Sequence, residues 1–520
     1  MDKVVLYDTT LRDGSQTEGV SFSTEDKLDV LKRLDHFGID YIEGGWPGSN
    51  PKDAAFFEAA SAMKLEHARL TAFGSTRRAG ITAKEDANLK MILASGAKCV
   101  AIFGKSWDFH VSSALKISNE ENLELVADSV SFLKSNGCEV VFDAEHFFDG
   151  YANNTSYAME VLEAATTAGA DWLVLCDTNG GSLPTFVTEV VKKVGRKFDV
   201  PIGVHAHNDS ELAVANSLAA VAAGATMVQG TINGLGERTG NANLCSIIPN
   251  LALKMGKKLT PQNLEGLTSL STFVAETANV LADAKLPYVG RSAFAHKGGI
   301  HVSAMMRNPR TYEHIDPSVV GNERRILVSE LAGTASIQAK IREFGIDTEK
   351  EDGRVILEQL KMLEAEGYQF EGADASFELL VRRLQDGIKP PFHMEGFRIF
   401  VDVGRESVSS EASIKVLDSD GSMEHTAADG NGPVNALDRA VRKALERFYP
   451  QLKEVRLADY KVRVIDGKDA TGAKVRVLIR STDGTGTWTT VGVSTNIIEA
   501  SLAALLDSME YKLLKGSKQP

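Results

Sequence analysis

The sequence has few cysteines and no long apolar segment. Only four of its 520 residues are cysteine, and none forms a CxxC pair, so we expect buried, reduced thiols rather than a disulfide framework. No stretch has the length and apolarity needed to span a bilayer, and the N-terminus lacks the basic and apolar segments of a secretory signal. A cytoplasmic protein with no membrane partner is the expectation.

The chain also lacks an excess of basic residues. Its 57 Lys and Arg residues are outnumbered by 70 Asp and Glu residues, which gives a formal net charge of −13. This balance argues against a general nucleic-acid binder, which would need a basic field over its surface. With 43% hydrophobic and 24% charged residues, the composition is typical of a globular protein, and the length predicts two or three domains.

The first half repeats one pattern, in which a short β-branched apolar run is followed by a polar turn and an amphipathic helix. The runs are Val4–Thr9, Tyr41–Trp46, Leu70–Ser75, Cys99–Gly104, Glu139–Glu145, Trp172–Thr178, Ile202–Asn208 and Met227–Ile232. Eight such units predict a parallel sheet that closes into a TIM barrel. An open doubly wound sheet is the alternative, but it would need a glycine-rich phosphate turn after the first run, and residues 11–14 do not provide one.

The remaining chain divides into a helical part and a strand-rich part. Residues 266–390 are predicted to form helical subdomains, and the Pro-Pro pair within 388–392 to act as a linker. Residues 391–520 are predicted to form an α+β domain with an internal duplication, because a strand, an Asp-Gly turn, a glycine and an amphipathic helix occur twice in the same order. The duplicated helices begin near Pro433 and Asn496. The barrel is expected over residues 1–265.

Two histidines on the seventh run are the sharpest chemical signal. His205 and His207 are two residues apart, so their side chains share one face of a strand. In a barrel that face is the interior, and catalytic groups gather at the carboxyl ends of the strands. Two adjacent inward imidazoles would each need polar partners, which makes structural packing a poor explanation. We interpret the pair as metal ligands.

Further ligands can come from neighbouring strands. Asp13, after the first run, supplies a carboxylate, and Asn241, after the eighth, supplies an amide oxygen. Strands one, seven and eight are neighbours in a closed barrel, so these side chains can converge. A mixed nitrogen and oxygen set suits Mn²⁺, Zn²⁺, Fe²⁺ or Mg²⁺. Two histidines and a carboxylate also resemble the facial triad of iron oxygenases, but an adjacent arginine, Arg12, favours polarisation of a substrate.

Five motifs in order resemble one enzyme family. They are Asp8–Gly14, His205–Asp209, Gly234–Asn241, Phe294–His301 and Tyr312–Pro317. Together with the duplicated C-terminal part, they are similar to the acyl-CoA-dependent 2-isopropylmalate, homocitrate and citramalate synthases over essentially the whole chain. Residues 42–53 look like the citramalate branch and depart from the turn of the isopropylmalate enzymes.

The resemblance implies a role for individual residues. It implies that Asp13, His205 and His207 bind a divalent metal ion (Mn²⁺, Zn²⁺ or Mg²⁺), that Asn241 is a further ligand or supports one, and that Arg12 stabilises the alkoxide formed from a 2-oxo acid. The other implied or candidate residues are Glu145 for proton transfer, Thr178 for the substrate carboxylate, His301 and Tyr312 for the acyl-CoA step, and Arg77, Arg78 and Lys105 for the CoA phosphates.

The expected substrates are acetyl-CoA and pyruvate. Trp46 and Phe103 are bulky residues at strand ends that would shorten the acceptor pocket and disfavour branched 2-oxo acids. The family pattern further implies a homodimer, in which His301 and Tyr312 often serve the partner subunit. The C-terminal duplication resembles a feedback domain, so isoleucine is the expected effector and leucine the second choice.

Three alternatives remain open at this point. One is the same chemistry on another 2-oxo acid, with 2-isopropylmalate synthesis first among them. A second is a metal-dependent acyl-CoA lyase or a carboxyltransferase barrel, although no rim lysine is marked for carbamylation. A third is a non-catalytic amino-acid sensor, which the complete set of Arg12, Asp13, His205, His207 and Asn241 argues against.

Overall fold

A computed structural model describes residues 3–261, 263–327, 334–346, 350–385, 387–403, 408–465 and 472–516. The chain divides into two compact units, of which the first comprises Met1–Phe294 with Ile315–Glu323, and the second comprises Ala295–His314 with Arg324–Pro520. Among the described residues, no helix is both long and apolar enough to cross a membrane.

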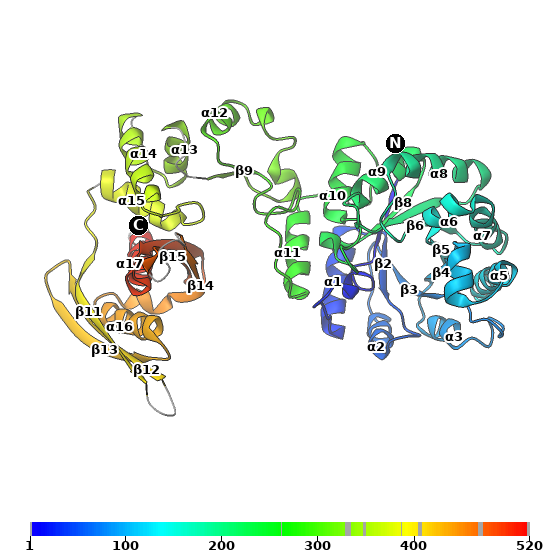
Figure 1. Ribbon diagram of the computed structural model, residues 1–520, viewed down its shortest axis with the longest axis horizontal. Coiled ribbons are helices and arrows are strands. Elements are labelled where there is room, and N and C mark those ends of the chain that lie inside the picture. The colour runs from blue at the N-terminus through cyan, green and yellow to red at the C-terminus, as the bar shows by residue number, and fades with distance from the viewer. Residues whose placement is uncertain are drawn as a thin grey trace. The chain divides into compact units, whose positions relative to one another are not determined.

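The first unit contains a closed barrel of eight parallel strands (Figure 1). The strands are β1 (Val5–Asp8), β2 (Tyr41–Gly45), β3 (Arg69–Ser75), β4 (Cys99–Lys105), β5 (Glu139–Glu145), β6 (Trp172–Asp177), β7 (Ile202–Ala206) and β8 (Met227–Gly230). Closure comes from β1, which pairs in parallel with both β2 and β8. The predicted TIM barrel is confirmed, and the open-sheet alternative is wrong because such a sheet would leave β1 or β8 without a second neighbour.

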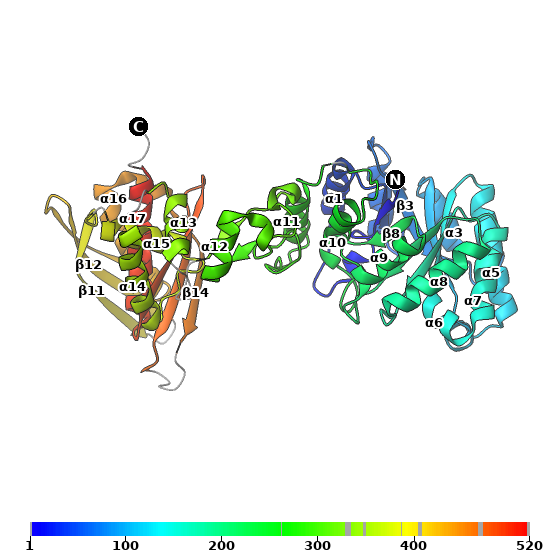
Figure 2. The same ribbon diagram turned by 90° about the horizontal axis from the view of Figure 1, so that it is seen from above.

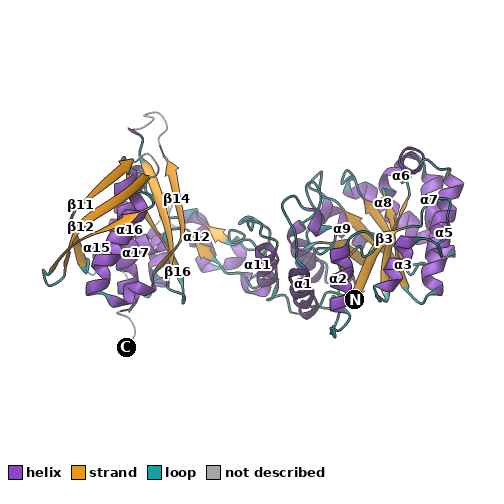
Figure 3. Cartoon of the chain, turned by 90° about the horizontal axis from the view of Figure 1, so that it is seen from below, coloured by secondary structure: helices purple, strands orange, loops and turns teal. Residues whose placement is uncertain are grey.

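Helices surround the barrel, and Figure 3 shows them in purple outside the orange strands. The principal ones are α1 (Thr24–Phe37), α2 (Pro51–Ala60), α3 (Ala87–Ala94), α5 (Asn119–Ser135), α7 (Thr155–Thr167), α8 (Pro184–Lys197), α9 (Ala213–Ala223), α10 (Leu244–Pro249) and α11 (Leu267–Thr277); the shorter α4 (Asp108–His110) and α6 (Phe147–Asn153) follow β4 and β5. Local sequence sets their ends. In α1, Ser23 and Asp26 form a capping box, and Gly38 ends the helix with a φ of 100°.

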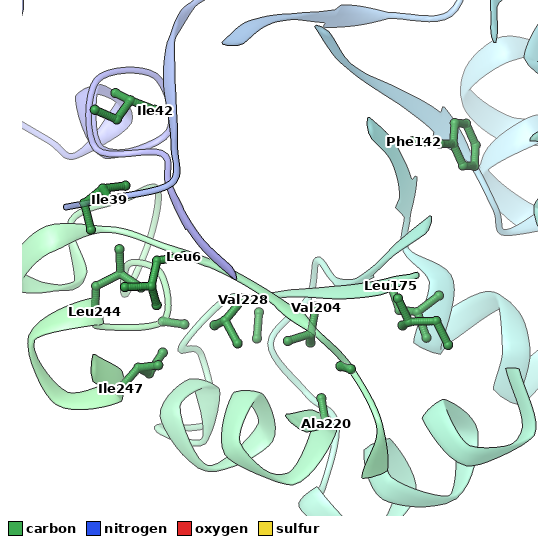
Figure 4. Packing of buried hydrophobic residues seen from close by; sticks show 14 of the residues in the cluster. Leu6, Ile39, Ile42, Phe142, Leu175, Val204, Ala220, Val228, Leu244 and Ile247 are labelled. Carbon is green, nitrogen blue, oxygen red and sulfur yellow. The ribbon is translucent and has the colours of Figure 1, made fainter. Parts of the chain in front are cut away.

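Strand side chains alternate between two apolar clusters. Val204 of β7 and Val228 of β8 point outward and pack with the helices, as Figure 4 shows beside Ala220 of α9. Val174 and Met227 belong instead to the cluster that fills the barrel interior. Because the interior is packed, the polar side chains that also point inward must bond to one another.

The second unit begins with short elements and continues with helices. These are β9 (Ala295–His296), α12 (Gly299–Arg307), β10 (Arg325–Ile326), α13 (Thr334–Glu343), α14 (Lys350–Ala365) and α15 (Asp374–Gln385). The helices agree with the sequence expectation, but the parallel pair of β9 and β10 was not expected. Two residues per strand are too few to produce an apolar run.

The C-terminal part of this unit is a tandem repeat of three strands and a helix (Figure 2). The first copy is β11 (Phe392–Val403), β12 (Val408–Asp418), β13 (Met423–Gly430) and α16 (Pro433–Phe448); the second is β14 (Arg456–Val464), β15 (Val475–Thr482), β16 (Thr487–Ser494) and α17 (Ile497–Gly516). The predicted duplication is confirmed. The domain limits at residues 265 and 390 stay a prediction.

Equivalent glycines let each helix lie close to the last strand of its copy. A Cβ on Gly430 would lie 2.3 Å from the backbone nitrogen of Ala436, and one on Gly492 would lie 2.0 Å from the carbonyl oxygen of Ala500. Both contacts are with helix backbone, which cannot move without shifting the helix. The two glycines are therefore part of the repeat.

Gly492→Ala should lower the stability of the C-terminal part by about 1–3 kcal/mol, because the added methyl must push α17 away from β16. Calorimetry of the full chain would detect this as a fall of several degrees in one unfolding transition. Gly396→Ala is the matched control, since a Cβ there meets no atom within 4 Å. Equal transition temperatures for both variants would contradict the close packing.

Candidate active site at the mouth of the barrel

Two histidines of β7 face the same point at the carboxyl end of the barrel. His205 lies within β7 and His207 directly follows it, so the alternation of the strand puts both rings on one face. The ring centroids are 5.1 Å apart, and the two Nε2 atoms are 3.3 Å apart. Both residues are buried, each with only 6% of its surface exposed.

Asp13 reaches this point from the short helical turn Gly14–Gln16 that follows β1. Its Oδ2 atom lies 3.5 Å from Nε2 of His205 and 3.9 Å from Nε2 of His207. The three residues can each offer a ligand atom, and these atoms all lie within 4.8 Å of one another. Strand β8 makes this possible, because it pairs with β1 on one side and β7 on the other.

Asn241 is held beside His207 by the backbone. The two residues form an isolated antiparallel bridge, and Ala242 donates its backbone N–H to Ala206 over 2.9 Å. The amide nitrogen of Asn241 donates to the carbonyl oxygen of Leu235 over 3.2 Å. The side-chain oxygen of Asn241 is left for another partner.

Three buried polar atoms of this group have no hydrogen-bond partner among the described residues. They are Oδ1 of Asp13, Nδ1 of His207 and Oδ1 of Asn241. Buried polar atoms are rarely left without a partner in native proteins. Carboxylate, imidazole and amide donors are all ligands for divalent ions of the Mn²⁺, Zn²⁺ and Mg²⁺ class. The two unpartnered oxygens, together with the Nε2 atoms of His205 and His207 that face Asp13, therefore fit a metal ion.

The protonation states of Asp13, His205 and His207 also favour the binding of a cation. Burial opposes charge on Asp13, yet the Arg12 guanidinium and the two neighbouring imidazoles lower the pKa of Asp13. Burial lowers the pKa of His205 to about 4 and also lowers that of His207. Near neutral pH the carboxylate is ionised and both imidazoles are neutral, which are the forms that bind metal ions.

Arg12 is fixed next to this group by a buried carboxylate. Its Nε donates to Oε1 of Glu43 over 2.5 Å, and Tyr7 donates its hydroxyl to Oε2 of the same residue over 2.5 Å. The guanidinium carbon lies 3.8 Å from the ring centre of Phe73. Because Glu43 and Asp13 raise the pKa of Arg12 against the effect of burial, the site keeps one fixed positive charge.

Gln229 of β8 connects His205 to a buried acid. Its Oε1 lies 2.9 Å from Nδ1 of His205, and its amide nitrogen donates to Oδ1 of Asp143 over 3.0 Å. With the amide in this orientation, Nδ1 of His205 carries the proton and Nε2 faces Asp13 with its lone pair. Burial raises the pKa of Asp143 to about 8.

An aromatic wall forms one side of the site. Trp46 meets Phe73 edge-on, with centroids 5.7 Å apart and an interplanar angle of 84°, and meets Phe103 at 5.7 Å and 83°. The rings of Phe73 and Phe103 stack at 5.5 Å. Aromatic pairs of this geometry hold one another in place.

Glu145 and Thr178 lie at the ends of neighbouring strands. Glu145 forms an ion pair with Lys105, so this lysine, which we considered for CoA phosphates, is already engaged by a carboxylate. The hydroxyl oxygen of Thr178 accepts the backbone N–H of His146 over 2.8 Å, and its carbonyl oxygen accepts a bond from Arg238 over 2.7 Å.

A single cavity of about 250 Å³ collects most of the candidate residues. Those that line it are Arg12, Asp13, Trp46, Phe103, Glu145, Thr178, His205 and His207, together with Gln16, Phe73, Asp143, Cys176, Glu237 and Arg238. The sequence motifs did not point to the last six of these residues, nor to Glu43 and Gln229. A charged or amide residue inside an otherwise apolar strand, as at Glu43, Asp143 and Gln229, was the sequence signal that could have identified some of them.

The other candidates lie elsewhere. Arg77 forms an ion pair with Asp128 over 2.5 Å, and Arg78 is exposed on the turn after β3. His301 and Tyr312 belong to the second unit, where their rings stack with centroids 4.2 Å apart. Their predicted roles are not tested by this geometry and stay predictions.

Comparison with known proteins gives a family for this architecture. Residues 3–274 match the HMGL-like family, residues 288–368 the homocitrate synthase post-HMGL domain-like family, and residues 371–513 the LeuA allosteric (dimerisation) domain. The first match spans the barrel and all of the proposed metal ligands. The chain belongs to the HMGL-like family.

Relatives of similar length narrow the position within the family. The (R)-citramalate synthase of Aquifex aeolicus is 56% identical, and the match covers 100% of this chain and 99% of that protein. The (R)-citramalate synthase of Geobacter sulfurreducens is 55% identical over the same shares. The probable 2-isopropylmalate synthase of Methanopyrus kandleri is 35% identical and covers 97% of each chain.

Gln229→Leu should weaken metal binding by about 10–100-fold, because Nδ1 of His205 and the Asp143 carboxyl group would both lose their partner. Titration calorimetry with Mn²⁺ on the full chain measures this directly. The double variant Gln229→Glu with Asp143→Asn keeps both hydrogen bonds. In this variant the residue at position 143 donates to the residue at position 229, which is the reverse of the wild-type direction. That double variant should recover most of the affinity.

Unchanged Mn²⁺ affinity in Gln229→Leu would contradict the role of this hydrogen-bonded pair. A loss of Mn²⁺ affinity that the double variant does not recover would contradict the assigned donors and acceptors of these two hydrogen bonds.

Proposed function

We propose that this chain condenses acetyl-CoA with pyruvate and hydrolyses the resulting thioester, forming (R)-citramalate for isoleucine synthesis. The observation that carries the proposal is full-length similarity at 46–56% identity to five proteins named (R)-citramalate synthase. Relatives named as 2-isopropylmalate synthases are 33–35% identical. The aromatic side chains of Trp46, Phe73 and Phe103 that line the cavity are consistent with a small 2-oxo acid as the acceptor.

In this proposal Asp13, His205 and His207 hold a divalent ion, with Asn241 beside them. The ion would supply Lewis-acid polarisation of the 2-oxo group. Mn²⁺, Zn²⁺ and Mg²⁺ all accept such a donor set. Two oxygens that lack a hydrogen-bond partner among the described residues, Oδ1 of Asp13 and Oδ1 of Asn241, support the assignment.

Arg12 and Thr178 would bind the acceptor. Negative charge develops on the ketone oxygen as the new carbon–carbon bond forms, and a guanidinium already fixed by Glu43 can stabilise that charge without reorganising. The Thr178 hydroxyl lies in the same cavity and can donate to the substrate carboxylate. Trp46, Phe73 and Phe103 would then face the methyl group of pyruvate.

Glu145 is the proposed proton-transfer residue. The methyl group of acetyl-CoA must lose a proton before it attacks the ketone, and Glu145 is the carboxylate that lines the cavity while paired with a lysine. His301 and Tyr312 remain proposed residues of the acyl-CoA step. Arg77 and Arg78 remain candidates for the CoA phosphates, with Lys105 in that role only after leaving Glu145.

The C-terminal repeat suggests regulation and assembly. Its match to the LeuA allosteric (dimerisation) domain supports the proposal of a homodimer that responds to a small effector. Isoleucine, as the end product of a pathway that begins with citramalate, is the first candidate, and leucine is the second.

The purified enzyme should release CoA from acetyl-CoA fastest with pyruvate, and more slowly with 2-oxobutyrate, 2-oxoisovalerate and 2-oxoglutarate. Removal of divalent ions with a chelator should abolish turnover, and Mn²⁺, Zn²⁺ or Mg²⁺ should restore it. A thiol-release assay with each acceptor measures both effects. Faster release with 2-oxoisovalerate would favour the 2-isopropylmalate reaction. Turnover that persists after complete metal removal would contradict the mechanism.

Trp46→Ala and Phe103→Ala should each raise the kcat/KM for 2-oxoisovalerate relative to pyruvate. One additional methylene in a restrictive pocket typically changes this ratio by about 10–200-fold. Val228→Ala, which removes a side chain from the outer face of the barrel, is the control for general loosening. An unchanged ratio in both pocket variants would show that the wall does not select the acceptor.

A further inference from the structure

Trp46 reaches the cavity through an irregularity in β2. The pairing of β2 with β3 shifts register between Glu43 and Gly45, so one extra residue is accommodated. Regular alternation from the inward-facing Glu43 would turn Trp46 away from the interior. The irregularity instead points it inward, where it meets Phe73 and Phe103. Such bulges commonly redirect a side chain beside an active site.

The backbone at this turn is held by a buried ion pair. The backbone N–H of Trp46 donates to Oδ2 of Asp53 over 2.9 Å, and Nζ of Lys27 lies 2.5 Å from Oδ1 of the same carboxylate. Lys27 also donates to the carbonyl oxygen of Gly44 over 2.9 Å. Asp53 and Lys27 thus fix the backbone of Trp46, but these contacts leave its indole ring free to rotate.

The ring is fixed by Asn88 of α3. Its side-chain oxygen accepts the indole N–H of Trp46 over 2.5 Å, and its amide nitrogen donates to the carbonyl oxygen of Ser75 over 3.0 Å. Asn88 does not line the cavity. A hydrogen bond at the outer edge of the indole therefore controls the angle of a surface that the substrate would meet.

The structure leaves room for this contact with two glycines. A Cβ on Gly48 would lie 2.8 Å from the side-chain oxygen of Asn88, and one on Gly74 would lie 3.1 Å from the same atom. Side chains at either position would displace the amide group. The close fit around Asn88 keeps its side chain in one position, and that position holds the indole at one angle.

We propose that Asn88 is a specificity-determining positioning residue, which limits the acceptor to small 2-oxo acids by locking the indole of Trp46 across the cavity. The inference rests on the proposed function for the identity of the acceptor. Without the bond, rotation of Trp46 about its side-chain torsions would open space where the acceptor side chain lies. Phe73 and Phe103, which contact the indole edge-on, would also lose a fixed neighbour.

The test compares kcat/KM for 2-oxoisovalerate and for pyruvate in four variants of the full-length enzyme. Asn88→Leu removes both hydrogen bonds at similar volume, and Asn88→Asp keeps the oxygen that accepts the indole N–H. Trp46→Phe removes the indole donor, and the fourth variant combines Trp46→Phe with Asn88→Leu. We expect Asn88→Leu to raise the ratio of 2-oxoisovalerate to pyruvate at least tenfold, and Asn88→Asp to stay within threefold of wild type.

The double variant separates positioning from a general structural effect. If Asn88 acts through the indole, Asn88→Leu should change the ratio no further in the Trp46→Phe background. Mn²⁺ affinity should be the same in all variants, since neither residue contacts a proposed ligand. An unchanged ratio in Asn88→Leu, or an equal effect with and without the indole donor, would overturn the inference.

If the proposed function is wrong, the wild-type enzyme will not prefer pyruvate, which is a result distinct from those above. A comparison of a small with a large acceptor in the same four variants would still test the role of Asn88.

Discussion

Closure of the barrel is the constraint on which the site depends. Asp13 and His207 are nearly two hundred positions apart in the chain, and they meet because β8 bonds to β1 on one edge and to β7 on the other. Strand alternation then determines which side chains point inward. Once the sheet closes, the turn after β1 brings the Asp13 carboxylate to the two imidazoles of β7, and the three groups occupy one small volume.

Placing these groups together creates an electrostatic problem that the surrounding residues solve. Arg12, Glu43, Asp143 and Asp13 are all buried or nearly so, and isolated charges at such positions would be strongly unfavourable. Glu43 bonds to Arg12 and to Tyr7, and Gln229 bonds to His205 and to Asp143. Oδ1 of Asp13 and Oδ1 of Asn241, which have no hydrogen-bond partner among the described residues, lie where a cation would bind.

Sequence patterns were sufficient to predict the elements in which residue types recur at a regular spacing. Eight apolar runs predicted the barrel, and the spacing of His205 and His207 predicted their common face. The duplicated C-terminal strands and helices were visible for the same reason. These features repeat or alternate, so each residue is supported by its neighbours in the sequence.

Contacts between single residues of distant elements were not predictable in this way. Glu43 and Gln229 are isolated polar residues within apolar runs, and only the closed barrel shows what they bond to. Lys105 has the charge expected of a phosphate ligand, but it pairs with Glu145 on the neighbouring strand. Trp46 was selected for its bulk, whereas its orientation depends on a register shift and on Asn88, which no motif contains.

The central claim is that one divalent ion is held by Asp13, His205 and His207. Pulsed electron paramagnetic resonance of the full chain loaded with Mn²⁺ tests it most directly, because the nitrogen couplings count the bound imidazoles. The account predicts one tightly bound ion per chain with couplings from two imidazoles, reduced to one in His205→Ala. A tightly bound ion without imidazole couplings, or no tightly bound ion, would contradict it.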